Sequence, residues 1–162
     1  MLSVASKPHT TLGVNAAFLQ EVKDSNLQLW TCLRELREVK YAEDSEPIEA
    51  SRVFVNLLGE LRDCIALEFS LEETYGFIEG ATQSLVGFGL ADASTAKMQH
   101  RELYLQLHEI CEQAEEAQYR GTISRDLAMF IGAFEKFDDC FRAHEDLEAE
   151  LIRCGLGHKR GV

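Results

Sequence analysis

The stretch Phe134-Glu-Lys-Phe-Asp-Asp-Cys-Phe-Arg-Ala-His-Glu-Asp-Leu-Glu148 places an aromatic residue every three or four positions, and the same spacing then brings in His144 and Glu148. Residues at this spacing lie on one face of an α-helix. The face that should be buried therefore ends in an imidazole and a carboxylate. Burying such groups is costly unless they are paired or bound to a cation, so this stretch predicts a core helix with a polar site inside the fold.

Three other stretches show the same periodicity, and none carries a competing β-strand pattern. Helices are predicted at about residues 14–39, 47–79, 94–118 and 124–153. Pro47 suits the first turn of the second helix, and Gly155 with Gly157 should end the fourth. Short connections make consecutive helices antiparallel, so the predicted fold class is all-α, an up-down-up-down four-helix bundle.

The domain organisation that follows is simple. The 162 residues suffice for one domain with a real core. We expect a flexible N-terminal tail at residues 1–13, a four-helix bundle domain at 14–155 and a C-terminal tail at 156–162.

Composition limits the partners. Asp and Glu outnumber Lys and Arg by 28 to 16, a net charge of −12, which argues against nucleic acid and against an anionic membrane surface. No run of apolar residues is long enough to span a bilayer. The five cysteines show no CxxC spacing and are interpreted as reduced thiols, which predicts a cytoplasmic protein.

Every predicted helix carries polar residues within its apolar face. They are Asn26 on the first, Glu68 and Glu72 on the second, His100 and Tyr104 on the third, and His144 and Glu148 on the fourth. The three pairs are each four positions apart, so both members share one helical face. Counting from the connections at about 1.5 Å per residue places the pairs at similar levels, whereas Asn26 fits less cleanly. Four helices that each point such groups inward are typical of a metal site in a bundle.

Each of these residues also has an ordinary structural interpretation. A single histidine on an apolar face is usually a hydrogen-bonded core residue, and Tyr104 would then be a core residue with its hydroxyl at the rim. Asn26 would set the register of the bundle. The coincidence on four helices favours metal binding, with each pair either giving one ligand to each of two metals or chelating a single ion.

On these residues the chain resembles the hemerythrin-like (HHE cation-binding) domains over about residues 14–153. That family has His on the first helix, His-x-x-x-Glu on the second, His-x-x-x-His on the third, and His-x-x-x-x-Asp or His-x-x-x-Glu on the fourth. In Leu67-Glu-Phe-Ser-Leu-Glu-Glu73, Glu68 stands where the family has His, and Glu72 stands at the bridging carboxylate. In Ser25-Asn-Leu-Gln-Leu-Trp-Thr-Cys-Leu-Arg-Glu-Leu36, Asn26 stands at the first-helix His.

The other two motifs match in the same way. His100-Arg-Glu-Leu-Tyr104 is similar to the third-helix motif, with Tyr104 in place of the second His. Phe141-Arg-Ala-His-Glu-Asp-Leu-Glu148 is similar to the fourth in its His-x-x-x-Glu form. Three of the five family histidines are therefore replaced, by Asn, Glu and Tyr, which makes the donor set richer in carboxylate.

The resemblance implies a site for two irons per chain, inside the bundle. Glu72 would bridge the metals, Tyr104 would be a phenolate ligand and Asn26 a weak ligand or a partner of one. The terminal ligands would be Glu68, His100, His144 and Glu148. A carboxylate-rich set favours Fe(III) and also suits Mn or Zn. The implied role is sensing of, or slow redox reaction with, oxygen, peroxide, nitric oxide or iron, in a protein that is not a dedicated enzyme.

Two other functions remain open from the sequence. A metal-free bundle could serve as an interaction or signalling module, alone or as a homo-oligomer, with its polar residues paired among themselves, for example His144 with Glu68. A histidine-phosphotransfer bundle would need an exposed His100, with Lys97 and Arg101 near the phosphoryl group.

Overall fold

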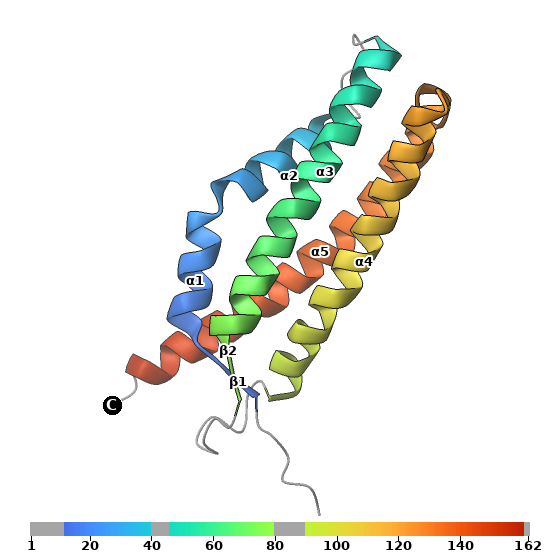
Figure 1. Ribbon diagram of the computed structural model, residues 1–162. Helices are drawn as coiled ribbons and strands as arrows, with labels where there is room; N and C mark the ends of the chain where they lie inside the picture. The colour runs from blue at the N-terminus through green and yellow to red at the C-terminus, as the bar shows by residue number, and fades with distance from the viewer. Residues whose placement is uncertain (1–11, 40–45, 80–89, 161–162) are drawn as a thin grey trace, which may run out of the picture.

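The computed structural model describes residues 12–39, 46–79 and 90–160, and this part of the chain is almost entirely helical (Figure 1). The all-α class predicted from the sequence is confirmed. The elements are β1 Leu12–Val14, α1 Ala16–Ser25, α2 Leu27–Val39, α3 Pro47–Leu71, the π-helical turn η1 Glu72–Gly76, β2 Phe77–Glu79, α4 Leu90–Tyr119 and α5 Ile123–Arg160. Residues 1–11 and 161–162 of the predicted tails lie outside the described residues.

Consecutive helices pack against one another through their apolar faces. Helix α2 contacts α3, α3 contacts α4, α4 contacts α5, and α1 packs against α5 (Figure 1). The main core lies where α2, α3, α4 and α5 meet. It includes the fully buried side chains of Leu33, Leu61, Leu107 and Phe137, one from each helix. A smaller cluster around Leu19 and Ile152 joins α1 to α5.

The first predicted helix is interrupted at Asn26, the C-terminal cap of α1, whose backbone dihedrals of −94° and 60° leave the helical region. The Asn26 backbone N–H donates to the Lys23 carbonyl oxygen at 3.4 Å. The Trp30 indole N–H donates to the same oxygen at 3.1 Å. Helix α1 therefore takes a direction different from that of α2 (Figure 1), although the apolar spacing continues across the break.

The α-helical part of the second predicted helix ends at Leu71, and the π-helical turn η1 continues it to Gly76. Its predicted end, residues 77–79, is the strand β2, so the expectation of no strand is wrong. After η1, β2 pairs antiparallel with β1, with Val14 opposite Phe77 and Leu12 opposite Glu79. The Asn15 backbone N–H continues this connection by donating to the Gly76 carbonyl oxygen at 2.8 Å. A three-residue strand carries too little periodic pattern to be recognised without its partner.

The fourth predicted helix should end near residue 153, but α5 runs through Arg160. Gly155 does not stop it, and the position serves close packing instead. A Cβ at Gly155 would lie 2.7 Å from the Ala16 Cβ, so the absence of a side chain lets α1 approach α5.

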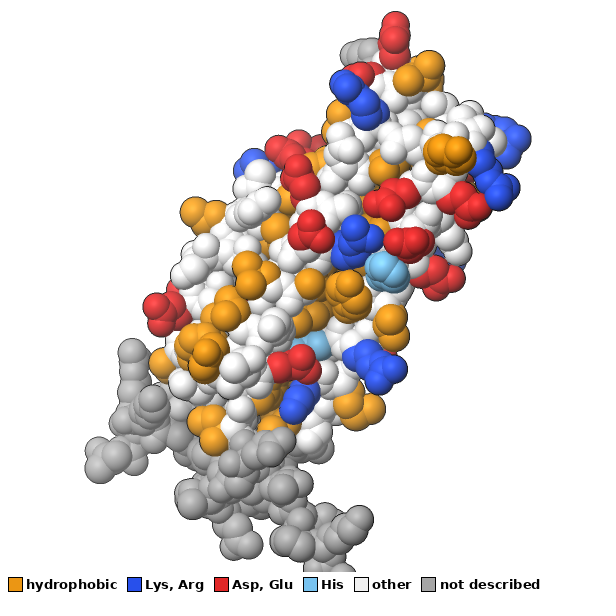
Figure 2. Space-filling model, in the orientation of Figure 1, with side chains coloured by type: hydrophobic (Ala, Val, Ile, Leu, Met, Phe, Trp, Pro, Cys, Tyr) orange, Lys and Arg blue, Asp and Glu red, His pale blue; other side chains and the backbone are white. Residues whose placement is uncertain are grey.

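Charged and apolar side chains are mixed on the drawn surface of these helices. On the face drawn in Figure 2, acidic and basic groups are interspersed, with apolar side chains between them. Within the described ranges, no helix combines the length and apolar character required to cross a bilayer.

Candidate metal centre

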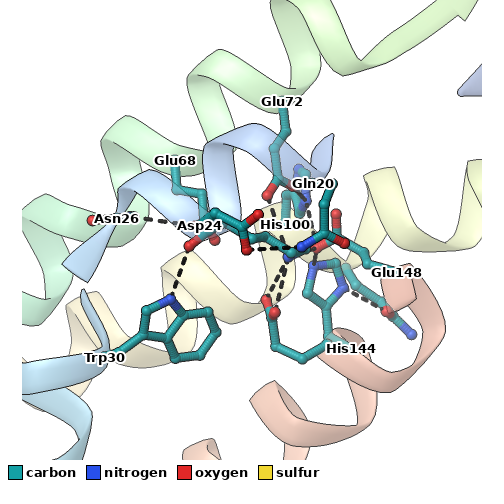
Figure 3. Close-up of polar contacts among 12 residues, drawn as sticks. Gln20, Asp24, Asn26, Trp30, Glu68, Glu72, His100, His144 and Glu148 are labelled. Atoms are coloured by element: carbon teal, nitrogen blue, oxygen red, sulfur yellow. Dashed lines mark hydrogen bonds and ion pairs between the residues drawn. The ribbon is translucent and has the colours of Figure 1, made fainter. Parts of the chain in front are cut away.

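Four of the predicted ligands meet inside the fold. Glu72 comes from η1, His100 from α4, and His144 and Glu148 from α5, and the four side chains point toward one another (Figure 3). One potential ligand atom from each lies within 4.8 Å of the other three. None of the four residues is more than 3% exposed. Segments far apart in the sequence thus bring two imidazoles and two carboxylates to one buried point.

The contacts inside this cluster are close but are not hydrogen bonds. The Nε2 atom of His100 lies 3.1 Å from Oε2 of Glu72 and 3.7 Å from Oε1 of Glu148. His144 Nε2 is also adjacent to Glu148 Oε1. Several of these buried atoms have no hydrogen-bond partner, namely both His100 ring nitrogens, His144 Nε2, and Oε2 of Glu72 and of Glu148. Lone pairs that converge without hydrogen bonds fit a bound cation.

Other buried polar side chains are paired in the ordinary way. Asp138, 6% exposed, accepts two hydrogen bonds from the Arg37 guanidinium at 2.7 and 2.9 Å. The Ser51 hydroxyl donates to the Pro47 carbonyl oxygen at 2.6 Å. Most unpartnered buried side-chain atoms of the described residues therefore belong to the cluster and to neighbouring Glu68.

The two imidazoles are held in fixed orientations. His144 Nδ1 lies 2.8 Å from Oε1 of Gln99, and donation of this N–H leaves the Nε2 lone pair pointing into the cluster. The His100 ring stacks on Phe69 with centroids 4.0 Å apart and an interplanar angle of 9°. Phe77 of β2 packs its ring against His100 at 5.8 Å, so the strand pair helps to enclose the site.

Two charged residues that the sequence interpretation missed complete the site. The Lys23 ammonium lies 2.8 Å from Oε2 of Glu145, 3.4 Å from Oε1 of Glu148 and 3.5 Å from Oε1 of Glu72. The Lys23 side chain is only 11% exposed. A signal was available, because Lys23 precedes Asn26 by one helical turn and Glu145 adjoins His144. Charged residues beside an apolar face are usually solvated, however.

The carboxylates keep the lysine charged. Burial alone would lower the pKa of Lys23, but the negative charges of Glu148, Glu145 and Glu72 raise it above its ordinary value. The pKa of Glu145 is raised, first because of its own burial. The Lys23 side chain therefore stays a charged ammonium between these carboxylates.

Without a metal, protons must relieve the remaining negative charge. Burial and the adjacent Glu148 carboxylate raise the pKa of Glu72 to about 11. Burial raises the pKa of Glu68 to about 7. Burial would also raise the pKa of Glu148, but its contacts with His100 and His144 hold that pKa below its ordinary value. The metal-free site thus holds protons that a cation would displace.

The other predicted ligands lie beside the four-residue cluster. Glu68 is 1% exposed, and its Oε1 accepts a hydrogen bond from the Asn26 side chain at 3.3 Å. Tyr104 is half-buried, and its ring stacks on His108 with centroids 5.8 Å apart. Metal ligation by Glu68, Asn26 and Tyr104 stays a prediction.

A pocket of about 350 Å³ adjoins the cluster on the His100 side, between α3 and α4. Its lining includes Ala66, Phe69, Ser70, Thr74, His100 and Tyr104. His100 itself is 3% exposed. An imidazole as buried as this is a poor phosphoryl acceptor, which argues against the phosphotransfer interpretation. A small molecule bound in the pocket would lie beside His100, a candidate metal ligand.

Comparisons of this chain with protein-family models, with curated proteins and with solved structures found no match. What the cluster can do therefore follows from its own donor atoms, charges and surroundings. These are two imidazoles, two carboxylates, an adjoining lysine and a neighbouring pocket.

Proposed function

We propose that this protein is a hemerythrin-like metal-binding protein, which holds non-haem iron between Glu72, His100, His144 and Glu148. The observation that carries the proposal is the convergence of these four buried side chains, with ligand atoms within 4.8 Å of one another. Buried imidazole and carboxylate lone pairs without hydrogen-bond partners are rare unless something binds them.

The order of the donors along the chain supports the hemerythrin-like assignment. We take α1 and α2 together as the first helix of an antiparallel up-down-up-down four-helix bundle, with α3, α4 and α5 as the others. In this arrangement Glu72 belongs to η1, which continues the second helix, His100 to the third helix, and His144 with Glu148 to the fourth. Those are the helices on which the hemerythrin-like motifs place their ligands.

The charge of the site supports a cation as well. Carboxylates surround a single ammonium, and they come from Glu68, Glu72, Glu145 and Glu148. If all four ionise, three negative charges remain uncompensated in a buried environment, and such charges must be neutralised by protons or by a metal. A metal ion coordinated by Glu72 and Glu148 would neutralise them without protonating the ligands.

The donor set also limits the metal and its ligands. Two imidazoles and two carboxylates suit iron, and they would also accept Mn or Zn. The pocket beside His100 is large enough for a small molecule, which supports a role in binding oxygen, peroxide or nitric oxide. When bound, the metal would supply the redox chemistry, and the chain would orient the ligands and exclude bulk water.

Metal analysis tests the proposal. Protein purified from iron-supplemented cells should contain iron, and nitric oxide added to the reduced protein should change its visible spectrum. His144→Ala should lose the metal, whereas His108→Ala should retain it, because the His108 side chain is 42% exposed and lies outside the cluster. Background metal in a cooperatively folded wild-type protein, even after incubation with iron, manganese or zinc, would reject the proposal.

One observation favours a second candidate function, a metal-free bundle that acts as an interaction module. Lys23 already gives Glu72, Glu145 and Glu148 a cationic partner. If this second function is correct, Lys23→Ala would reduce the free energy of unfolding. The metal content of the wild type and of every variant would stay at background.

A further inference from the structure

Glu72 faces two different positions at which a cation is favoured. Its Oε2 lies 3.1 Å from His100 Nε2, on the side of the imidazoles. Its Oε1 lies 3.5 Å from the Lys23 ammonium, on the side of α1. Glu148 also faces both positions, because its Oε1 adjoins His144 and lies 3.4 Å from Lys23. The carboxylates of Glu72 and Glu148 therefore lie between two positions. One position is beside the two imidazoles, and the other is occupied by the Lys23 ammonium.

We propose that the Lys23 ammonium occupies a second cation position of this centre, so that the wild-type site takes one metal ion beside a built-in organic cation. Removing the ammonium would open a second metal position formed by Glu145, Glu72 and Glu148. This inference rests on the proposed function, since it presupposes a metal in the first position. It also departs from the sequence expectation of two irons per chain.

The lysine is held in place by its backbone as well as by its charge. The carbonyl oxygen of Lys23 accepts hydrogen bonds from the Trp30 indole at 3.1 Å and from the Asn26 backbone N–H at 3.4 Å. These bonds lie at the break between α1 and α2. The break thus fixes the last turn of α1 where the Lys23 side chain can enter the cluster.

The surroundings of the ammonium are those of a metal ion. Three carboxylates contact it, at 2.8 to 3.5 Å. Among the described residues, no other Lys or Arg pairs with Glu72, Glu145 or Glu148. Without Lys23 these oxygens would face one another with no cation between them, which is a strong driving force for binding a hard metal ion.

Charge balance agrees with one metal beside the lysine. The four surrounding carboxylates can carry four negative charges. A trivalent ion plus the Lys23 ammonium brings four positive charges, and two divalent ions without the lysine bring the same number. A second divalent ion in the wild-type site would lie next to the Lys23 ammonium and repel it strongly. Binding of that ion would therefore have to displace the ammonium or overcome the repulsion.

Stoichiometry of Mn²⁺ binding to the full-length metal-free protein is the direct test. We would measure bound manganese per chain after equilibrium dialysis, together with the electron paramagnetic resonance spectrum, which separates isolated from spin-coupled ions. The variants are Lys23→Ala, Lys23→Arg, which keeps a cation, and Lys136→Ala, which removes an exposed lysine of α5 as a matched control.

The wild type, Lys23→Arg and Lys136→Ala should each bind one ion with an uncoupled spectrum. Lys23→Ala should bind two, with a coupled spectrum, and Lys23→Ala combined with Glu145→Gln should return to one. Two ions in the wild type would overturn the inference even if Lys23→Ala failed to fold. One ion in a folded Lys23→Ala would overturn it as well. No manganese in any variant, with iron and zinc also at background, would reject the proposed metal function itself.

Discussion

The hydrogen bond between His144 and Gln99 shows how one residue outside the cluster can control it. Gln99 Oε1 accepts from Nδ1 of His144 at 2.8 Å, so the opposite nitrogen keeps its lone pair for a metal. His100 is oriented differently, by stacking on Phe69. The tautomer of His144 is therefore fixed by a polar partner, whereas the ring of His100 is held by aromatic stacking.

We predict that Gln99→Leu weakens metal affinity by about 10–100-fold, because His144 loses the acceptor that fixes its ring and tautomer. Gln99→Glu keeps an acceptor at this position and should retain more of the affinity. Titration against a competing chelator measures both effects, with Gln28→Leu on the exposed surface of α2 as the control. Equal affinities for the wild type and Gln99→Leu would show that the hydrogen bond does not orient a ligand.

At the scale of elements, the π-helical turn η1 connects the site to α1. It begins with Glu72 and ends with Gly76, and π-helical turns recur at functional sites because they redirect the chain within a helix. The Gly76 carbonyl oxygen accepts the Asn15 backbone N–H. A Cβ at Gly76 would overlap the buried Leu19 side chain. The absence of a side chain at Gly76 thus permits α1, which carries Lys23, to dock beside Glu72.

Alanine at two glycines should have opposite effects on stability. Gly76→Ala should lower the free energy of unfolding by roughly 1–3 kcal/mol, because overpacking against Leu19 displaces α1. Gly59→Ala should raise it by up to about 1 kcal/mol, since glycine is a poor helix former and nothing lies within 4 Å of a Cβ there. Urea unfolding of the metal-free proteins measures both changes. A stabilising Gly76→Ala would contradict the close packing of α1 on η1.

At the scale of the whole molecule, the cluster draws on η1, α4 and α5, and α1 adds Lys23 beside it. Its ligands can converge only when these elements are assembled, so metal binding is linked to global folding. The protons of the metal-free site add a pH dependence. The Glu68 pKa is raised by burial to about 7, so the folded protein holds a proton there that the unfolded chain releases above about pH 4.5.

Two linked changes in global stability follow. The metal-free protein should lose stability as pH rises from about 4.5 to about 7, where Glu68 releases its proton, and further toward about 11, where Glu72 does. The reason is that the unfolded state binds fewer protons than the folded state over this range. Metal at about 100 times its dissociation constant should add about 2.7 kcal/mol to the free energy of unfolding. Thermal unfolding at several pH values, with and without metal, measures both.

His144→Ala is the control for the second change, and its unfolding temperature should not respond to metal. A metal-free wild type whose stability increases steadily between these pH values would contradict the protonated buried carboxylates. Metal that leaves the wild-type transition unchanged would show that the ion binds outside the folded core.

Local spacing is enough to predict the helices and the inward positions of Glu72, His100, His144 and Glu148. Residues three or four apart share a helical face, and this geometry depends only on the helix itself. The same spacing predicts that Asn26, Glu68 and Tyr104 face inward. Spacing alone, however, cannot distinguish a residue that binds the metal from a residue that lies next to a ligand. Glu68 bonds to Asn26, and Tyr104 stacks on His108, because side-chain partners are chosen after the helices pack.

The tertiary structure alone decides the break at Asn26, the pairing of β1 with β2 and the place of Lys23. The apolar period continues through the break, and a three-residue strand exists only through its partner. A lysine at the edge of an apolar face would ordinarily extend into water. Here it turns inward because folding gathers carboxylates from η1 and α5 around the last turn of α1, and their combined charge outweighs the cost of burying an ammonium.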